Sequence, residues 1–551
     1  MWFVLSLCLT QVVAQSPVAD SVDAVVVCPK AWQGNLGPWL KHRAEQGVQV
    51  AVIDVDADAT SLQNKIRQVA KSHPNRLRYL LLVGDVPSLA KRLPGAITIP
   101  TFQVPSTAMV RFGSEPLIAS DNPYGDLDGD GLPELAVGRI PCDSQQDLDL
   151  WIQRVVAFER QVDYSQWRRR VHVVAGVGGF GMLIDSAVEM TAKQFISQGI
   201  PGGYSISLTQ ASPSSPYCPL PEAFAEATVS RFNEGGLFWI YLGHGNVRHL
   251  DFVKGERDWH CILDQQSLVK VRPGVKSPIA VFLACYTGAF DAKEDSLAEQ
   301  LVLQQDGPVA ALAGSRMTGP YGMSVLSSEM LEICFDQRCE TLGEVVRLAK
   351  CRSMSEATVE NGSGDQAANP KRKWIDQLAN ALSPSNHDLK QERFEHVQMM
   401  NLIGDPMLRI CHPEKVELEC EESIESGGLL KVRGYSALPG KITVDLIYRR
   451  DRIPEPARVA FAKLKKESVA ADKSSGDSQS GVVDRNELYE LANQSVICQE
   501  TGNVQVGPFE VVLQVPSDIK GACAVRAFVE SSDAWGLGSQ DISVRSKRTV
   551  K

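Results

Sequence analysis

The sequence predicts an α/β fold with a mostly parallel sheet and helices on both faces, followed by an all-β domain. From residue 23 to about residue 412, short apolar runs rich in β-branched residues alternate with segments of helical periodicity. Uninterrupted apolar strands that alternate with helices are typical of a parallel sheet that is buried on both faces. After Pro413 the runs become short strands without long helices between them, which indicates a β-sandwich.

The first region contains several buried strands separated by helical patterns. The expected strands are residues 24–28, 48–53, 79–83, 171–175, 237–242, 279–284 and 309–313. The expected helices are residues 39–46, a helix that begins at Thr60, and residues 148–162 and 186–197. Thr60 suits a helix start because its hydroxyl can accept a hydrogen bond from the first turn. That helix would place Leu62, Ile66, Val69 and Ala70 on one face.

The second region has the pattern of a β-sandwich of roughly 100 residues. Its expected strands are residues 416–420, 429–435, 442–449, 509–515 and 522–530. Residues 465–481 are rich in Lys, Ser, Asp and Gly, and we expect them to form a flexible insertion.

The N-terminus resembles an export signal. Residues 2–10 are an apolar run within the ~7–15 residues of a signal-peptide core, and small residues up to Ala14 offer a cleavage site. A signal peptide normally has a Lys or Arg before its apolar run, and this chain has none there. The alternative is a buried N-terminal strand. We expect a secreted or otherwise extracytoplasmic protein.

The rest of the chain gives no sign of a membrane or nucleic-acid partner. No other run approaches the ~18–20 apolar residues of a membrane span. The net charge of −10 is spread over 551 residues and gives no reason to expect nucleic-acid binding.

Two of the expected strands end in a reactive side chain flanked by small residues. Strand 237–242 runs into Gly243, His244 and Gly245, and strand 279–284 runs into Cys285. Ligands of open α/β sheets bind beyond the carboxyl ends of the strands. If the two strands are parallel neighbours, His244 and Cys285 meet at one edge of the sheet.

Such a pair suits acyl transfer. An imidazole can generate a thiolate nucleophile and later protonate a leaving amine. The main-chain N–H groups of Gly245 and Cys285 would then form an oxyanion hole. The alternative is that Cys285 is an ordinary buried cysteine and His244 a turn histidine.

Several blocks in the same order make the chain resemble the gingipain-like cysteine peptidases. The blocks are residues 79–85 (YLLLVGD), 121–141, 243–245 (GHG), 284–285 (AC) and 401–406 (NLIGDP). The resemblance spans residues 24–412, and the β-domain that follows fits the immunoglobulin-like module of that family. It implies a caspase-like fold and an endopeptidase that uses no cofactor for catalysis. His244 would be the general base and acid, and Cys285 the nucleophile.

The resemblance also points to residues that bind substrate. Relatives place a glutamate that orients the histidine at about the position of Val177 in this chain. Relatives that cleave after arginine place an aspartate further along the same turn, and Asp185 is the nearest match. A basic P1 residue, the one before the cleaved bond, is the corresponding expectation. Tyr321 stands where relatives have an aromatic wall of the substrate pocket.

An acidic loop has the core pattern of a calcium site. Asp126, Asp128 and Asp130 alternate before Gly131, which lets several carboxylate oxygens converge on one hard cation, and Glu134 offers another ligand. The full EF-hand spacing is absent. The alternative is an acidic turn held by Asx hydrogen bonds. Relatives bind structural calcium, so the resemblance supports the metal.

Two further motifs are less specific. Gly176, Gly178 and Gly181 match a dinucleotide fingerprint, but the strand that follows ends without the acidic residue that would bind a ribose. Cys334 and Cys339 are spaced for a local disulfide if the compartment is oxidising.

The leading interpretation is an exported cysteine endopeptidase that acts on a protein or peptide substrate through an acyl-enzyme. The alternatives are a catalytically degenerate binding or structural protein on the same fold, motivated by Val177, and a sortase-like transpeptidase. The predicted domains are a signal peptide at 1–14, an N-terminal α/β subdomain at 20–165, a catalytic subdomain at 166–413, and an immunoglobulin-like sandwich at 414–551 with its flexible insertion at 465–481.

Overall fold

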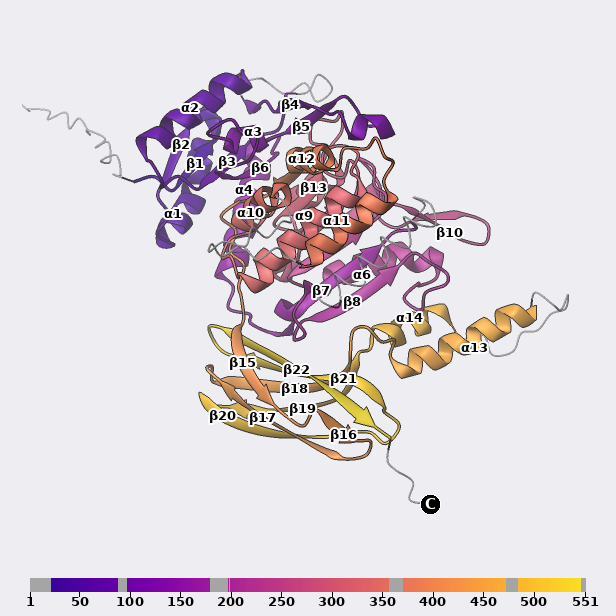
Figure 1. The fold of residues 1–551 in the computed structure, drawn as a ribbon. Coiled ribbons are helices and arrows are strands. Elements are labelled where there is room, and N and C mark those ends of the chain that lie inside the picture. Colours follow the sequence, from indigo (N-terminus) through magenta and orange to yellow (C-terminus); the bar gives the residue numbers. More distant parts are fainter. Residues whose placement is uncertain are drawn as a thin grey trace, which may run out of the picture.

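The computed structural model describes residues 21–87, 97–178, 197, 199–355, 370–471 and 484–546. The predicted signal peptide, Gly181 and Asp185 lie outside these residues. An α/β region comes first, and an all-β domain that begins with β15 lies beside it (Figure 1). This architecture confirms the predicted fold class.

The described part of the α/β region contains one ten-stranded sheet with the order β2-β1-β3-β6-β14-β13-β12-β9-β7-β8. Neighbouring strands are parallel, apart from β13 and β14, which are antiparallel. The strands are β1 (Ala24–Val27), β2 (Val50–Ile53), β3 (Tyr79–Val83), β6 (Ala136–Ile140), β7 (Arg170–Ala175), β8 (Ser205–Gln210), β9 (Phe238–Leu242), β12 (Ile279–Leu283), β13 (Ala311–Gly314) and β14 (Met400–Ile403).

Strand β14 lies in the middle of the sheet and was not among the predicted strands. It is only four residues long and follows a helix without a turn, so its sequence does not stand out as a strand. On one side it pairs with β13, and on the other Ile403 pairs with Arg139 of β6. Strand β14 therefore joins the early strands of the sheet to the late ones.

Helices cover both faces of this sheet. They are α1 (Gly37–Glu45), α2 (Ala59–Ser72), α3 (Asn122–Gly125), α4 (Gln145–Arg160), α6 (Phe224–Asn233), α7 (Gln265–Leu268), α8 (Leu297–Leu303), α9 (Pro320–Leu331), α10 (Leu342–Met354), α11 (Pro370–Leu382) and α12 (Leu389–Met399). Helices α9 to α12 lie together in front of the sheet in Figure 1. Two hairpins extend from the region, β4 (Phe102–Pro105) with β5 (Leu117–Ser120) and β10 (Phe252–Lys254) with β11 (Trp259–Cys261).

The start of α2 differs from the prediction. Its N-cap is Asp58, whose carboxylate accepts a hydrogen bond from the main-chain N–H of Ser61 at 2.7 Å. Thr60 lies inside the first turn instead. The error is small because both residue types cap helices well and only the backbone decides between them. The apolar face is as expected, since Leu62 and Ile66 are fully buried.

The described all-β domain is a nearly closed sheet with the hydrogen-bonded order β19-β18-β21-β22-β15-β17-β20, and β16 pairs with β22. The strands are β15 (Glu414–Glu419), β16 (Ser423–Glu425), β17 (Leu429–Ser436), β18 (Gly440–Tyr448), β19 (Val496–Val504), β20 (Gly507–Gln514), β21 (Gly521–Glu530) and β22 (Trp535–Arg545). Most of its core forms a cluster of its own, whereas Phe528, Trp535 and Leu537 pack into the core of the α/β region. The immunoglobulin-like assignment stays a prediction.

Two helices are inserted between β18 and β19, where the sequence predicted a flexible segment from residue 465. Helix α13 (Glu455–Ala471) continues through the first part of that segment, and α14 (Arg485–Asn493) follows residues that are not described. The prediction was wrong for residues 465–471. Lys, Glu and Ala are strong helix formers, and their high polarity was mistaken for loop composition.

Buried ions connect the two parts of the molecule. Arg169 of the α/β region and Arg526 of β21 each donate a hydrogen bond to Oδ2 of Asp445 on β18, both at 2.9 Å. All three side chains are buried. The negative charge of Asp445 therefore offsets the buried positive charges of both arginines at this interface.

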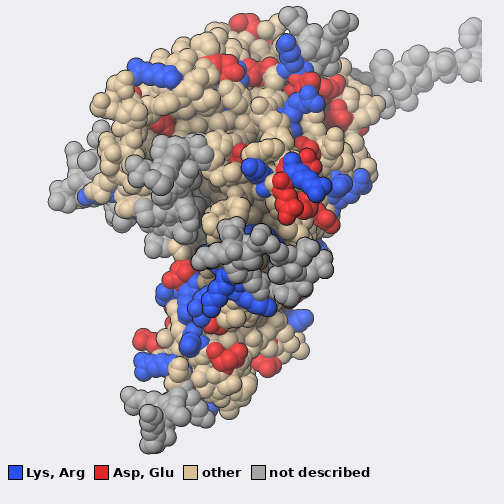
Figure 2. Space-filling view, turned by 90° about the vertical axis from the view of Figure 1, so that its right-hand side faces the viewer, with Lys and Arg blue, Asp and Glu red and all other residues tan. Residues whose placement is uncertain are grey.

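The surface mixes charges of both signs. On the face shown in Figure 2, acidic and basic side chains are interspersed among uncharged residues. Among the described residues, no helix is both long enough and apolar enough to cross a bilayer. That the protein binds no nucleic acid stays a prediction.

Candidate active site

His244 and Cys285 are placed by two neighbouring parallel strands. β9 and β12 pair in register, with Leu242 opposite Leu283, and each reactive residue follows two positions after its paired leucine. A Cβ on Gly245 would lie 2.7 Å from the main-chain oxygen of Cys285, so only glycine permits the close approach of the two strand ends. Both residues line the same pocket.

The imidazole of His244 is oriented by the main chain. Its Nε2 lies 2.9 Å from the carbonyl oxygen of Gly178, which can only accept, so Nε2 carries a proton in this arrangement. Gly178 follows Val177, the position at which the resemblance implies a glutamate. The side chain of Val177 is 45% exposed and makes no polar contact. A backbone carbonyl thus stands where a carboxylate was expected.

Hydrogen bonds to Asp251 hold this arrangement in place, and this residue was not predicted from the sequence. Its Oδ2 accepts hydrogen bonds from the main-chain N–H of Val177 at 3.0 Å, from that of His244 at 3.2 Å, and from the Tyr241 hydroxyl at 3.2 Å. A Cβ on Gly176 would lie 2.2 Å from the same oxygen. No local signal identifies Asp251, because one of its partners, Val177, lies 74 residues away in the chain.

Cys285 lies against the start of α9. Its Sγ accepts a hydrogen bond from the main-chain N–H of Thr318 at 3.3 Å and lies 3.5 Å from the Thr318 hydroxyl. Thr318 precedes the helix by two residues. A main-chain N–H group is thus aimed at the sulfur of Cys285. Thr318 was also missed, since it carries no motif of its own.

The residue after Cys285 has a strained backbone. Tyr286 has φ of +59°, in the left-handed region that non-glycine residues rarely adopt. Its hydroxyl donates to Glu115 at 2.9 Å, which fixes the ring. Strain of this kind costs about 1–3 kcal/mol and is concentrated at functional sites.

A pocket of about 480 Å³ opens beside the pair. It is lined by Met109, Phe112, His244, Cys285, Met317, Thr318, Gly319, Pro320, Tyr321, Ser324, Ile375, Leu378, Ala379, Leu382, Ser383, Pro384, His387 and Glu392. Tyr321, the predicted aromatic wall, is among them. Asp185, the other predicted substrate contact, is not among the described residues.

Three of the four carboxylates predicted for the calcium loop lie close together. Ligand oxygens of Asp126, Asp128 and Glu134 lie within 4.8 Å of one another. Asp130 does not belong to this group, and its Oδ1 accepts from the N–H of Leu132. Burial, then repulsion from Asp128 and Asp126, raises the pKa of Glu134. Asx hydrogen bonds also hold the loop, as at Asp126 and Gly129 (2.6 Å). The geometry suits both a cation site and an acidic turn held by Asx hydrogen bonds.

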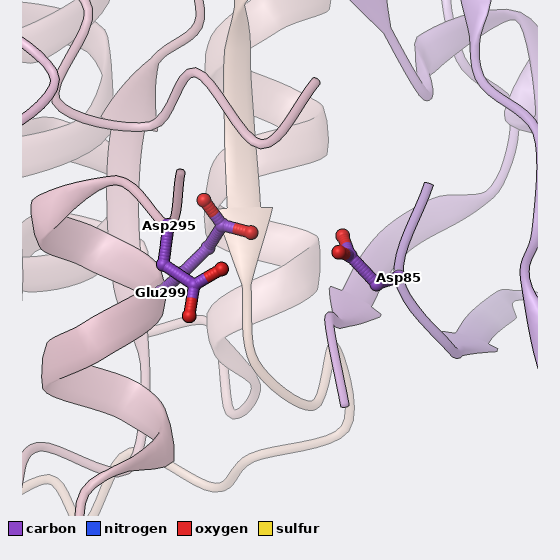
Figure 3. A group of neighbouring side chains, drawn as sticks. All are labelled: Asp85, Asp295 and Glu299. Atoms are coloured by element: carbon purple, nitrogen blue, oxygen red, sulfur yellow. The ribbon is translucent and has the colours of Figure 1, made fainter. Parts of the chain in front are cut away.

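A second group of carboxylates, not predicted from the sequence, consists of Asp85, Asp295 and Glu299. Figure 3 shows Asp295 and Glu299 side by side at the start of α8, with Asp85 facing them from the end of β3. Glu299 already closes a capping box, since its Oε2 accepts from the N–H of Ser296 at 2.7 Å. The group has the oxygen chemistry that hard cations prefer.

The predicted local disulfide is absent. Cys334 and Cys339 are free thiols, as are the other cysteines of the described residues. Cys334 is fully buried within a π-helical turn (Glu332–Asp336) that follows α9, whereas Cys339 lies beyond this turn and is partly exposed.

These features define an α/β protein with a cysteine and a histidine at the carboxyl edge of its sheet, over an adjoining pocket. The sequence model of peptidase family C25 matches residues 18–411, and the chain belongs to this family. Gingipain R2 of Porphyromonas gingivalis is 24% identical over 241 residues, which are 42% of this chain and 29% of that protein. Gingipain R1 of the same organism is 24% identical over 42% of this chain and 21% of its own length. The chain thus spans less than a third of these curated relatives.

Solved structures show the same fold. The crystal structure of the Arg-specific cysteine proteinase gingipain R superposes with a TM-score of 0.53 at 16% identity, covering 96% of this chain and 99% of the other. A complex of the pro- and mature domains of the Porphyromonas gingivalis proteinase gives a TM-score of 0.51 at 16% identity, over 95% and 100% of the two chains. Similarity at this identity establishes the fold alone.

Proposed function

We propose that the protein is a cysteine endopeptidase in which Cys285 is the nucleophile and His244 carries the proton. One observation supports this above all: β9 and β12 pair so that both side chains leave the sheet at the same level and line one pocket. Membership of peptidase family C25 supports the same chemistry.

The geometry suggests how the proton moves. Because Nε2 of His244 donates to the Gly178 carbonyl, Nδ1 is the nitrogen that takes the proton from the Cys285 thiol. The thiolate keeps the N–H of Thr318 as a hydrogen-bond donor. It attacks the carbonyl carbon of the scissile peptide, a C–S bond forms, and the carbonyl oxygen becomes an oxyanion held by the N–H groups of Gly245 and Cys285.

The intermediate then collapses. The C–N bond breaks as Nδ1 of His244 returns its proton to the leaving amine, which leaves an acyl-enzyme on Cys285. Water attacks the thioester while His244 takes a proton from it, and the acid product leaves as the thiol is restored. In this mechanism the Gly178 carbonyl and the Asp251 carboxylate orient His244, so a glutamate at position 177 is not required.

A thiol-reactive peptidyl probe tests the proposal. In calcium-containing buffer it should label the wild type and the Cys261→Ala control, in which another partly exposed thiol is removed, but not Cys285→Ala. If none of the probes in a broad panel labels Cys285, the result would favour a catalytically degenerate binding protein. Product masses decide the remaining alternative, because a transpeptidase joins the acyl group to an added amine and a hydrolase releases the free acid.

Export and calcium are further parts of the proposal. The apolar N-terminal run supports secretion, and intact mass of the purified native protein tests cleavage after Ala14. The cluster formed by Asp126, Asp128 and Glu134 supports a structural calcium ion there, with no part in the chemical step.

A further inference from the structure

We propose that a small cavity between the two parts of the molecule binds an inorganic tetrahedral oxyanion, such as phosphate or sulfate. The cavity lies where the all-β domain and its inserted helices meet β8, the last strand in the order of the ten-stranded sheet. Its lining includes neither Cys285 nor His244, so this inference does not depend on the proposed function.

Three arginines of the all-β domain line this cavity. Arg526 lies on β21, and Arg450 and Arg452 follow the end of β18. The opposite wall comes from β8 and from Tyr217 of the α/β region, and no carboxylate is among the described residues of the lining. Guanidinium groups match the geometry of phosphate and sulfate oxygens, so their concentration here indicates an anion site.

The α/β region holds the guanidinium groups in position. Arg450 donates to the carbonyl oxygens of Ile200 at 2.5 Å and of Pro201 at 2.6 Å. Arg450 and Arg526 both donate to the carbonyl oxygen of Tyr204 as well. These neutral acceptors fix the side chains without cancelling their charge. The cavity is therefore pre-organised for a ligand that brings negative charge.

Arg526 keeps one donor without an acceptor. Its Nη1 donates to the Ser205 hydroxyl and its Nη2 to Asp445, both at 2.9 Å. Its Nε is buried and has no hydrogen-bond partner, and the side chain as a whole is only 2% exposed. A buried donor in this state calls for a bound water or ion as its partner. An oxyanion in the cavity that Arg526 lines would offer an acceptor of opposite charge.

The junction is electrostatically unfavourable for the arginines as they stand. Burial, then repulsion from Arg169, lowers the pKa of Arg526 to about 9, although Asp445 opposes this shift. Burial also lowers the pKa of Arg450 to about 10, and Asp541, which opposes that shift, has a side chain that is 71% exposed. A bound anion would offset the buried positive charge that these shifts reveal.

The volume of the cavity limits the size of the ligand. It is about 70 Å³, which is room for a few water molecules at ~10–15 Å³ each. A single phosphate or sulfate ion fits this space, whereas a nucleotide or a peptide does not. Tyr217 adds a neutral donor to the lining, because burial raises the pKa of its hydroxyl to about 12 and keeps it protonated at neutral pH.

Titration calorimetry of the whole chain tests the inference. Sodium phosphate or sodium sulfate is added at an ionic strength held constant with sodium chloride, and Cys285→Ala is measured beside the wild type. Both proteins should bind one oxyanion per chain with saturable heat. Absence of saturable binding by both oxyanions would overturn the inference. Because Cys285→Ala lacks the proposed nucleophile, anion binding and the proposed peptidase activity fail or succeed separately.

A matched pair of variants assigns the ion to the cavity. Arg452→Gln removes one arginine of the lining, and it should fold because Arg452 is only partly buried and donates to the carbonyl of Lys520. Arg449→Gln removes the same charge from an exposed pair with Asp451, outside the cavity. Affinity should fall about tenfold or more in Arg452→Gln and stay unchanged in Arg449→Gln. Equal affinities of the two variants would overturn the assignment.

Melting curves separate specific binding from the general effect of these salts. Sulfate and phosphate stabilise proteins by their exclusion from the surface, so the wild type and both variants should gain some stability. A ligand that binds the folded state adds a further rise that depends on its concentration relative to its Kd. This further rise should appear in the wild type and in Arg449→Gln but not in Arg452→Gln. The same rise in all three proteins would count against the site.

Anomalous diffraction locates the ion without any substitution in the buried cluster of Arg526 and Asp445. Crystals of the whole chain grown without phosphate or sulfate are soaked in selenate, a sulfate analogue that carries an anomalous scatterer. A selenium peak should lie between Arg450, Arg452 and Arg526. Selenium peaks only at other places on the molecule would overturn the inference.

Discussion

The carboxylate of Asp251 accepts a hydrogen bond from the main-chain N–H of His244 at 3.2 Å. The same oxygen also accepts from Val177, which precedes the residue whose carbonyl faces the imidazole. One side chain therefore fixes both the backbone that carries the histidine and the backbone that orients its ring.

Asp251→Asn should weaken this arrangement. Asparagine keeps one acceptor oxygen but loses the charge that strengthens all three hydrogen bonds, so we expect a loss of about 1–3 kcal/mol of stability. Turnover should fall at least tenfold through kcat, because His244 loses its orientation. Denaturant unfolding and steady-state kinetics measure the two effects. Asp258→Asn, on the exposed tip of the β10–β11 hairpin, is the control and should change neither.

His244→Ala should remove most turnover and leave the fold intact. General acid–base catalysis contributes about 10²–10⁴-fold, and the loss of kcat/KM should fall in that range or above it. The melting temperature should stay nearly the same. A large drop in melting temperature would instead identify His244 as a structural turn residue. His260→Ala, in the neighbouring hairpin, is the control for both measurements.

Acid stability should depend on Glu395. Burial alone raises the pKa of this carboxyl, but hydrogen bonds from Ala108, Met109, Thr107 and Ser106 outweigh it and lower the pKa. A carboxyl whose pKa is lower in the folded state contributes stability above its unfolded pKa near 4.5 and loses it as pH falls through the folded pKa.

The test compares unfolding free energies across the acid range. Glu395→Gln should lose about 1.5–3 kcal/mol at neutral pH and show a shallower decline below pH 4.5. Glu222→Gln, an exposed control, should follow the wild-type profile. An acid profile of Glu395→Gln as steep as that of the wild type would contradict the prediction.

The ion cluster between the two parts of the molecule should be essential to stability. Asp445→Asn leaves Arg169 and Arg526 buried without their shared carboxylate, and removing one member of a buried ion pair costs about 3–5 kcal/mol. Asp451→Asn breaks an exposed pair with Arg449 and should cost at most about 1 kcal/mol. Thermal unfolding monitored by calorimetry distinguishes the two.

Chelation tests the calcium site. If the loop binds calcium, a chelator should lower the melting temperature of the wild type, and added calcium should restore it. Asp128→Asn should lower the melting temperature in calcium buffer and remove most of the response to chelator. If this variant still responded fully to the chelator, the cation would be assigned to the cluster of Asp85, Asp295 and Glu299 instead.

The sequence predicted what depends on short stretches of chain. The strands that end at Leu242 and Leu283 are apolar throughout, so they and the side chains after them could be found without a structure. Helix α13 was misjudged because polar helix formers and loop residues share a composition. Local patterns are reliable where burial is continuous and weak where the surface is polar.

The supporting residues of the site could not be found in this way. Asp251 and Thr318 act on groups that lie far from them in sequence: Asp251 accepts from the N–H of Val177, and the N–H of Thr318 donates to the sulfur of Cys285. Their chemistry depends on the partners, and a side chain that can accept hydrogen bonds is common everywhere in a chain. Long-range pairing, as at Ile403 and Arg139, has no local signature either.

The central position of β14 has a consequence for how the molecule is made. On a ribosome, nine strands of the sheet emerge before residues 400–403, yet the early and late strands have no direct pairing with each other until that segment arrives. Helices α11 and α12, which complete the pocket, emerge only shortly before it. A nascent chain therefore carries its cysteine and histidine long before the pocket beside them is complete, so the order of synthesis delays assembly of the site until the α/β region is whole.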